Sequence, residues 1–369
     1  MTDAPLDIFL VAPPGLEPLL AEEARAAGFH GVTPGPGGVS VTGDWTEAMR
    51  ANLVLRGAGR VLVRIASFRA MHLAQLDKRA RKLDWAAVLR PDVPVKVEAT
   101  CRASRIYHAG AAAQRIERAL TETLGVPLSD EAEVRLKLRI DDDLCTISVD
   151  TSGESLHKRG HKVSVGKAPM RETLAALFLR ACAFDGREPV LDPMCGSGTF
   201  PIEAAEIAAG LFPGRSRSFA FERLAVFDAG AWDGLRAGAP ERAAALSCYG
   251  SDRDAGAVSS ANENAARAGV GERCRFTRGA VSDLVRPEGP PGLVMVNPPY
   301  GARIGDRKLL FSLYGALGKV LTERFAGWRV GLVTSDGGLA KATGLPFRDP
   351  LGPIPHGGLK ITLHRTGVL

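Results

Sequence analysis

The sequence predicts an α/β fold whose second half is a mostly parallel sheet with helices on both faces. From about residue 168 onward, short apolar strands alternate with helical segments, the pattern that a parallel sheet requires. Residues 7–65 and 61–151 lack this alternation and are typical of two smaller α+β units. With 369 residues and 45% hydrophobic content, the chain can form two or three compact domains.

The front half is expected to hold short strands and amphipathic helices in mixed order. The first unit is predicted to contain a strand at 8–11, a helix at 15–27 and a strand at 39–41. The second unit is predicted to contain strands at 61–67, 93–99, 134–140 and 145–149, and helices at 73–85 and 109–124. Asp141, Asp142 and Asp143 indicate a hairpin turn rather than a metal site, because no further carboxylate run accompanies them.

The back half carries the alternating elements. Helices are predicted at 171–184, 198–209, 255–268 and 309–325, and strands at 190–192, 246–250, 275–278, 292–296, 328–334 and 359–365. Ligands of such folds bind at the carboxyl ends of the parallel strands. The turns that follow these strands are therefore the first places to look for a functional site.

The charge distribution favours a polyanionic partner. The net charge is +6 with a pI near 9.1, and basic residues outnumber acidic ones between Arg56 and Arg105. A second basic group occupies 157–162. Such clusters suit a nucleic acid, since each neutralised phosphate releases counterions, although a solvated basic face is the alternative. The candidate RNA contacts are Arg79, Arg81, Lys82, Lys158 and Arg159.

The cysteine pattern and the chain start limit the class of protein. The six cysteines form no CxxC pair, which indicates reduced thiols and neither a zinc site nor a disulfide framework. The chain begins without a basic segment followed by an apolar one, and no apolar run reaches the roughly 20 residues that cross a bilayer. A cytoplasmic protein with no membrane partner and no metal is expected.

A glycine-rich turn after the strand at 190–192 is the first candidate ligand site. Its sequence, Asp-Pro-Met-Cys-Gly-Ser-Gly-Thr at 192–199, leads into a helix. Gly196 and Gly198 let the backbone turn sharply and approach a ligand, and the helix start offers free N–H groups. No Gly-Lys-Ser/Thr or full GxGxxG is present, and the charge of Asp192 would repel a phosphate but suits an ammonium group.

Acidic residues near the ends of the next two strands identify the cofactor. Asp252 is placed to accept hydrogen bonds from two ribose hydroxyls, and Asp283 follows the third strand, where an adenine amine would lie. An ammonium, a ribose and an adenine on successive strand ends describe S-adenosylmethionine better than NAD, which needs a pyrophosphate site. S-adenosylmethionine is therefore the predicted cofactor.

The motif Asn-Pro-Pro-Tyr-Gly at 297–301 follows the fourth strand and is predicted to be catalytic. The side-chain carbonyl of Asn297 and the backbone carbonyl of Pro298 can accept the two hydrogens of an exocyclic amine, with Pro299 fixing the backbone. This grip aims the nitrogen lone pair at a methyl group and stabilises the developing positive charge. Tyr300 offers a face on which the base can stack.

These motifs resemble those of class I S-adenosylmethionine-dependent methyltransferases that act on exocyclic amines. Residues 150–161 and 167–174 resemble a narrower group, the bacterial THUMP-domain RNA methyltransferases, including the amino-terminal half of large-subunit ribosomal RNA guanine-N2 methyltransferases. The resemblance implies a Rossmann-like catalytic domain at 153–369, a THUMP RNA-binding domain at 61–152 and a ferredoxin-like domain at 1–60.

The resemblance also assigns residues. It places Asp192, Gly196, Gly198 and Asp252 on the cofactor and implies that a segment from Lys167 to Thr173 closes over its methionine end. The full expected cofactor set is Lys167, Arg171, Thr173, Asp192, Met194, Cys195, Gly196, Gly198, Thr199, Asp252 and Asp283. Cys195 is expected to pack rather than act as a nucleophile, since no histidine partner is near in sequence.

Two departures from the family leave alternatives open. Relatives often carry an acidic residue where this chain has Ala280, so the adenine falls to Asp283 or to the backbone. The segment 212–245 is either a substrate-facing loop or a passive excursion. The expected reaction is methylation of guanosine N2 in 23S ribosomal RNA; the alternatives are a transfer RNA guanosine, DNA adenine N6, and a non-catalytic RNA-binding assembly factor.

Overall fold

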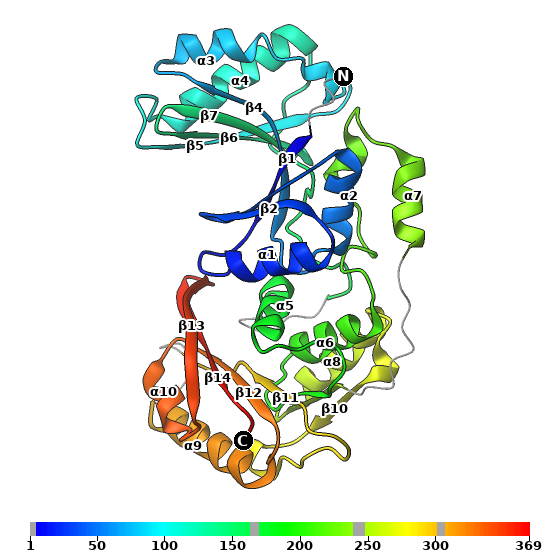
Figure 1. Cartoon of the computed structure of the whole chain (residues 1–369), viewed down its shortest axis with the longest axis vertical. Coiled ribbons are helices and arrows are strands. Elements are labelled where there is room, and N and C mark those ends of the chain that lie inside the picture. Colours follow the sequence, from blue (N-terminus) through cyan, green and yellow to red (C-terminus); the bar gives the residue numbers. More distant parts are fainter. Residues whose placement is uncertain (1–4, 163–169, 239–247, 301–306) are drawn as a thin grey trace. The chain divides into compact units, whose positions relative to one another are not determined.

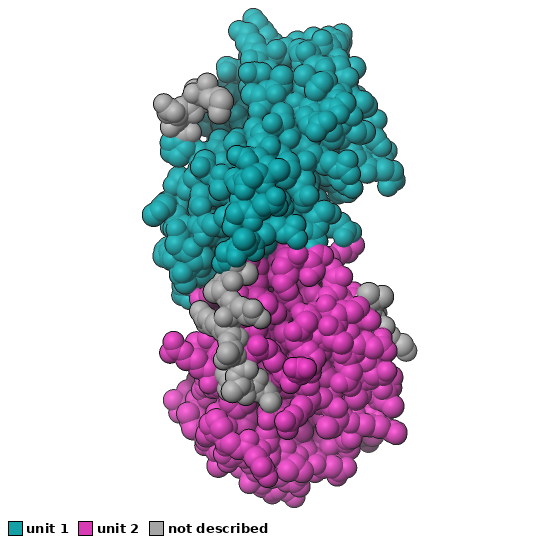
Figure 2. Space-filling model, turned by 90° about the vertical axis from the view of Figure 1, so that its right-hand side faces the viewer, with its two compact units in different colours: residues 1–12, 20–156, 217–238 teal, residues 13–19, 157–216, 239–369 magenta. Residues whose placement is uncertain are grey.

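The computed structural model describes residues 5–162, 170–238, 248–300 and 307–369. Contacts divide the chain into two compact units, shown in different colours in Figure 2. The first comprises residues 1–12, 20–156 and 217–238, and the second comprises 13–19, 157–216 and 239–369. Residues 217–238, expected within the catalytic domain, therefore belong to the front unit.

One seven-stranded sheet runs through the first unit in the order β2-β3-β1-β4-β7-β6-β5. The strand β4 pairs antiparallel with both β1 and β7, so the two α+β modules expected from the sequence share a single sheet. Figure 1 shows α3 and α4 side by side over the part of the sheet that contains β5 and β6. The elements are β1 (Leu6–Val11), α1 (Glu17–Ala26, whose first residues belong to the second unit), β2 (His30–Gly35), β3 (Gly38–Gly43), α2 (Trp45–Val54), β4 (Arg60–Arg69), α3 (Leu73–Ala80), η1 (Trp85–Ala87), β5 (Val95–Arg102), α4 (Ala109–Leu124), β6 (Val134–Asp141), β7 (Leu144–Asp150), η2 (Ala220–Arg223) and α7 (Ala229–Ala237).

The segment 217–238 is a packed part of this unit. Trp232 is 4% exposed and meets the rings of Phe219 and Phe221 edge-on, and the Phe221 N–H donates to the Thr151 carbonyl at 3.1 Å. Trp85 is also buried, with its indole N–H donating to the Ala80 carbonyl at 3.0 Å. Both tryptophans are therefore core residues rather than exposed stacking platforms.

A second seven-stranded sheet forms the other unit, in the order β10-β9-β8-β11-β12-β14-β13. Neighbours from β10 to β12 are parallel, and β14 is antiparallel to both β12 and β13, which confirms the predicted α/β architecture. Its elements are α5 (Glu172–Ala181), β8 (Val190–Asp192), α6 (Thr199–Ala209), β9 (Cys248–Asp252), α8 (Ala255–Arg267), η3 (Gly271–Arg273), β10 (Cys274–Arg278), η4 (Val281–Asp283), β11 (Leu293–Val296), α9 (Arg307–Arg324), β12 (Arg329–Thr334), α10 (Gly337–Ala342), β13 (Phe347–His356) and β14 (Leu359–Thr366).

The core of this sheet explains why its central strands are uniformly apolar. All four residues of β11 are buried, because helices cover both faces. Val294 and Val296 pack in one cluster with α9 side chains such as Tyr314 and Leu317. Met295 points to the opposite face, where its sulfur approaches Gly331 so closely that an added Cβ would lie 2.3 Å away. Among the described residues, no helix is long and apolar enough to cross a membrane.

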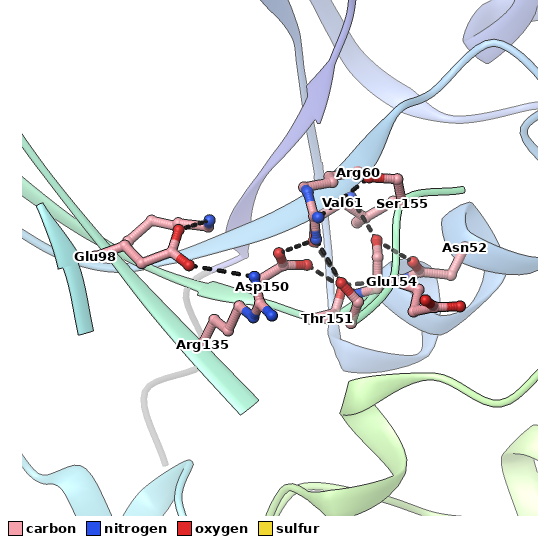
Figure 3. A network of polar contacts seen from close by, with 12 residues as sticks. Asn52, Arg60, Val61, Glu98, Arg135, Asp150, Thr151, Glu154 and Ser155 are labelled. Atoms are coloured by element: carbon pink, nitrogen blue, oxygen red, sulfur yellow. Dashed lines mark hydrogen bonds and ion pairs between the residues drawn. The ribbon is translucent and has the colours of Figure 1, made fainter. Parts of the chain in front are cut away.

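A buried polar network ties the end of β7 to α2 and β4 within the first unit (Figure 3). Asp150 is fully buried and pairs with Arg60 at 2.6 Å. Asn52 donates to the Thr151 hydroxyl at 2.8 Å, and that hydroxyl donates to the Val61 carbonyl at 2.8 Å. Burial raises the pKa of Asp150, and the charge of Arg60 opposes that rise. The ion pair thus keeps a desolvated carboxylate compensated.

Replacing Arg60 with methionine is expected to lower the free energy of unfolding by about 2 kcal/mol, because Asp150 loses its charge partner inside the protein. The loss stays at this level because Arg60 is 23% exposed and the Ser152 amide still donates to Asp150. Arg64→Met is the matched control, since its pair with Asp7 is 32% and 47% exposed and contributes less than about 1 kcal/mol. Equal losses in urea unfolding would contradict this role for Arg60.

Candidate functional site

The site lies where the strand order of the second sheet reverses. The strand β8 has β9 on one side and β11 on the other, so the chains leaving β8 and β11 diverge at this switch point. Leu191 pairs with Val294 in parallel register, which brings Asp192 and Asn297 to the same edge of adjacent strands. The predicted cofactor turn and the predicted catalytic motif therefore meet at the carboxyl ends of neighbouring strands.

The glycine turn is shaped by two different requirements. Both Gly196 (φ 51°) and Gly198 (φ 84°) adopt left-handed backbone conformations that favour glycine. A Cβ on Gly198 would lie 3.1 Å from Ala261, Ile202 and Phe276, so this glycine permits close helix packing at the start of α6. A Cβ on Gly196 would meet nothing within 4 Å, so the backbone here borders open space that a ligand can approach.

Asp192 is a buried carboxylate at the end of β8. It is 3% exposed and accepts a hydrogen bond from the Met194 N–H at 3.0 Å. Burial raises the pKa of Asp192 to about 8, the charge of Asp252 acts in the same direction, and the Met194 hydrogen bond opposes both. No cation of the described part of the chain pairs with Asp192, and a buried acid without such a partner is suited to an ammonium ligand.

Asp252 ends β9 and contacts the same turn. Its two carboxylate oxygens accept hydrogen bonds from the Gly196 and Asp254 N–H groups, each at 3.0 Å. The Cys195 N–H donates to the Ser251 carbonyl at 2.9 Å, which fastens the turn to β9. Asp283, in contrast, is exposed in the short helix η4, and its carboxylate accepts from the Ser282 hydroxyl at 3.2 Å.

Cys195, expected to pack in the turn, is 6% exposed. Burial raises the pKa of its thiol well above the ordinary range, with Asp192 and Asp252 adding to the shift. A thiol that resists ionisation is a poor nucleophile, in agreement with a packing role.

The Asn-Pro-Pro-Tyr motif directly follows β11 and holds a buried hydrogen-bond acceptor. The Oδ1 atom of Asn297 is buried, yet it accepts no hydrogen bond from the described part of the chain. The hydroxyl of Tyr314 donates to the Pro299 carbonyl at 3.3 Å, which supports the motif from α9. Burial raises the pKa of Tyr300 to about 12, so its ring stays neutral. A buried acceptor without a donor is costly unless a ligand supplies the donor.

The basic segment 157–162 differs from its prediction as a nucleic-acid contact. Arg159 is 2% exposed and pairs with Glu203, itself 1% exposed, at 3.4 Å. A guanidinium so deeply buried cannot reach a phosphate, so the prediction of Arg159 as an RNA contact is wrong. His161 is 5% exposed, and its Nδ1 lies 3.9 Å from Glu206. Burial lowers the pKa of His161, in keeping with a neutral ring. Lys158 is exposed, as an RNA contact requires.

Two residues that support the turn, one partly buried and one fully buried, were not predicted. Lys162 donates to the Thr199 hydroxyl at 2.8 Å and pairs with Glu172 of α5 at 3.0 Å. Asn264 donates to the Ser197 carbonyl at 3.1 Å and is fully buried on α8. Asn264 had a detectable signal, a polar residue on the apolar helix face formed by Ala261, Ala265 and Ala268. Lys162 had none, because its partners lie far away in the sequence.

The remaining predicted residues are placed as follows. Arg171 is exposed at the start of α5, and Thr173 is 5% exposed in its first turn. Lys167 lies outside the described residues. On the first unit, Arg79 and Lys82 are exposed, whereas Arg81 pairs with both Asp77 and Glu122. The hydrogen bond from Arg81 to Glu122, followed by that to Asp77, raises the Arg81 pKa.

Two family models match the chain. One, described as RMKL-like, methyltransferase domain, covers residues 159–346, and one described as RlmL ferredoxin-like domain covers residues 7–62. The ribosomal RNA large subunit methyltransferase K/L of Syntrophotalea carbinolica is 38% identical, over 93% of this chain and 51% of the relative. The chain thus spans about half the length of that relative.

Other relatives match over nearly their whole length. The protein slr0064 of Synechocystis sp., which carries a provisional RNA methyltransferase name, is 31% identical over 95% of this chain and 93% of the relative. A solved structure of a possible methylase from Clostridium difficile 630 has a TM-score of 0.89 at 28% identity, covering 99% of this chain and 98% of that chain. SMU.472, provisionally named a methyltransferase and complexed with SAH, has a TM-score of 0.88 at 26% identity with the same coverage. The fold, the site and these relatives together show that the chain belongs to the RMKL-like methyltransferase family, with the class I methyltransferase fold and the ferredoxin-like front domain that its sequence predicted.

Proposed function

We propose that the chain methylates the exocyclic N2 amine of a guanosine in 23S ribosomal RNA, with S-adenosylmethionine as the methyl donor. The observation that carries the reaction type is the buried Oδ1 of Asn297, which accepts no hydrogen bond within residues 5–162, 170–238, 248–300 and 307–369 and lies at the end of the strand beside the Asp192 turn. An amine N–H is the donor that this oxygen lacks. A second acceptor, the Pro298 carbonyl, follows it directly in the chain.

The residues of the turn fit the cofactor. The buried Asp192 would bind the ammonium group, Asp252 would accept from the ribose hydroxyls, and the open side of Gly196 leaves room between them. Met194, Cys195, Gly198 and Thr199 would complete the turn, with Arg171 and Thr173 at the start of α5. S-adenosylmethionine, when bound, supplies a methyl group on a positively charged sulfur.

The chain's own contribution to catalysis is positional and electrostatic. Asn297 and Pro298 would hold the two amine hydrogens, so that the nitrogen lone pair points out of the base plane. Their oxygens also stabilise the positive charge that grows on the nitrogen. Pro299 would fix the backbone, and Tyr300 would stack on the target base after that base has flipped out of the RNA helix.

Ribosomal RNA is proposed as the substrate from the names of the relatives. The relatives of Syntrophotalea carbinolica and Methylococcus capsulatus, 38% and 35% identical, are both named ribosomal RNA large subunit methyltransferase K/L. We further propose a ferredoxin-like domain at 1–60, a THUMP domain at 61–152 and a catalytic domain at 153–369, from which residues 217–238 depart to pack in the front unit. The choice of guanine over adenine follows the resemblance of motifs, because Asn297 and Pro298 would accept either amine.

Mass spectrometry of nucleosides tests this function. Ribosomal RNA, transfer RNA and DNA would be isolated from cells with and without the gene and from cells carrying Asn297→Ala. The proposal predicts loss of N2-methylguanosine from 23S RNA alone. Loss from transfer RNA, loss of N6-methyladenine from DNA, or no change in any nucleoside would support the transfer RNA, DNA or non-catalytic alternative and contradict the proposal.

The raised pKa of Asp192 predicts a pH-dependent affinity for the cofactor. Because this pKa is about 8 without ligand, the carboxyl is mostly protonated at pH 6 to 7, and binding an ammonium requires its ionised form. Affinity for S-adenosylhomocysteine should therefore rise about tenfold from pH 6 to 7, with release of a proton. Calorimetry in two buffers measures both effects, and Asp192→Asn should abolish the slope. The same slope in that variant would show that another group titrates.

A further inference from the structure

Three loops meet at one end of the front sheet. The register places Arg69, the last residue of β4, opposite Leu144, and Arg102, the last residue of β5, beside Asp141. The loop after β4, the loop after β5 and the β6–β7 turn therefore lie together. We call the exposed residues Met71, Arg102, Arg105 and Tyr107 of these loops the Tyr107 platform.

Backbone hydrogen bonds hold the three loops in one arrangement. The Ala70 N–H donates to the Asp143 carbonyl at 3.0 Å, and the Asp142 N–H donates to the Arg102 carbonyl at 3.3 Å. The Arg105 N–H donates to an Asp143 carboxylate oxygen at 2.7 Å. A surface fixed in this way loses little conformational entropy when it binds a partner.

The Tyr107 platform exposes an aromatic side chain to solvent. Tyr107 is 84% exposed, although its neighbour Ile106 is 4% exposed and anchors the loop in the core. Met71 is 45% exposed, and its sulfur lies 3.4 Å from the Arg105 guanidinium. An aromatic face next to arginine is the combination that stacks on an unpaired base and contacts its phosphate.

The acidic residues of the neighbouring turn are already engaged. Asp143 accepts the backbone hydrogen bond from Arg105, Asp141 pairs with Arg139 at 2.7 Å, and Asp142 lies 3.6 Å from Arg69. Neither Arg102 nor Arg105 forms an ion pair with any residue in the described ranges. The hydrogen bond from Arg139, and to a lesser extent the charge of Arg102, lower the pKa of Asp141. Because Asp141 is bonded to Arg139, both platform arginines keep their guanidinium groups available to an anion.

Two arginines on α3 and α4 of this unit are paired, unlike the arginines of the Tyr107 platform. Arg81, predicted from sequence as an RNA contact, bonds to Asp77 and Glu122, and Arg118 pairs with Glu122 at 2.6 Å. An incoming phosphate would have to break such pairs, whereas at the Tyr107 platform it would not. The platform is thus a better contact for an anion than Arg81 or Arg118.

We propose that the Tyr107 platform binds unpaired nucleotides of the RNA substrate, with Tyr107 stacked on a base and Arg102 and Arg105 on the flanking phosphates. This inference rests on the proposed function for the identity of the polymer. Unpaired rather than duplex RNA is indicated, because a base in a helix offers no free face to an aromatic ring.

The experiment measures binding of a fluorescent single-stranded RNA about twelve nucleotides long to the full chain without cofactor. Tyr107→Ala should weaken binding about tenfold, and Tyr107→Phe should restore it because the ring is kept. Arg102→Glu with Arg105→Glu should lower the slope of log Kd against log salt by about 1.4. The control is Arg118→Glu with Arg223→Glu, which changes the charge equally at paired residues that are 58% and 59% exposed.

Thermal unfolding of each variant checks the fold. The proposal is overturned if Tyr107→Ala binds RNA like the original chain, or if the control pair weakens binding as much as the arginine pair. It is also overturned if poly-L-glutamate displaces the RNA and Tyr107→Ala has no effect, which would indicate an acidic peptide as the partner. Methyl transfer is measured in a separate assay. A chain that binds RNA at the Tyr107 platform but methylates no RNA therefore contradicts only the proposed function.

Discussion

Replacing Asn297 with alanine should lower the methyl-transfer rate by about two orders of magnitude or more, while affinity for the cofactor stays nearly constant. The reason is that its buried Oδ1 lacks a donor among the described residues, and that Asn297 follows β11, which is separated from β9 and its terminal Asp252 by β8. The oxygen would act on the amine of the base, so its loss affects the transition state and not cofactor binding. Single-turnover kinetics and calorimetry measure the two quantities.

Two further variants sharpen this test. Asn297→Asp keeps an acceptor oxygen and should retain more activity than the alanine variant. Asn262→Ala removes an exposed asparagine whose amide donates only to its own helix, at the Val258 carbonyl, and should leave the rate unchanged. A parallel fall in cofactor affinity and rate for Asn297→Ala would contradict its assignment to the base.

Replacing Asp252 with alanine should lower the affinity for the cofactor by about a hundredfold, since two hydrogen bonds to a charged group contribute about 3 kcal/mol together. The structure offers a competing explanation, because Asp252 also accepts from the Gly196 N–H and so shapes the turn. An S-adenosylhomocysteine analogue without the ribose 2′ and 3′ hydroxyls separates the two. If Asp252 binds the ribose, the loss disappears with the analogue; if it only shapes the turn, the loss remains and the ribose assignment fails.

The sequence predicted most of the alternating elements, because parallel strands buried on both faces are short apolar runs that stand out from their surroundings. The strand β13 escaped prediction for a physical reason. It contains Pro350, Pro353 and Pro355, which normally argue against a strand, but it pairs only with β14 at the sheet edge and shifts register at Leu351. An edge position tolerates residues that cannot donate to a ladder.

The helix α2 was also missed, although it carries a signal in the sequence. Its N-cap Asp44 accepts from the Glu47 N–H at 2.8 Å, and a capping residue followed three positions later by glutamate is typical of helix starts. The strand order of the first unit was not predicted, because local sequence patterns do not contain it. That β4 joins both modules into one sheet depends on pairing between segments far apart in the chain.

The residues of the candidate site that lie at strand ends could be predicted from the sequence, whereas the residues packed around them could not. Asp192 and Asp252 end their strands, and Asn297 directly follows β11, as the pattern indicated. Turn glycines, prolines and polar residues after apolar runs mark such strand ends directly. The prediction of Arg159 as an RNA contact came from its charge alone. In the sequence Arg159 cannot be told apart from the exposed Lys158, but in the structure it is buried against Glu203. Burial is decided by packing against α6, which a count of basic residues does not contain.

A crystal structure with S-adenosylhomocysteine and guanosine monophosphate tests the central claim most directly. The account predicts the cofactor's amino group within hydrogen-bonding distance of Asp192, its ribose on Asp252, and the two N2 hydrogens of the nucleotide on the Asn297 Oδ1 and the Pro298 carbonyl. A nucleotide bound away from Asn297, or a cofactor group hydrogen-bonded to the Asn297 Oδ1, would contradict it.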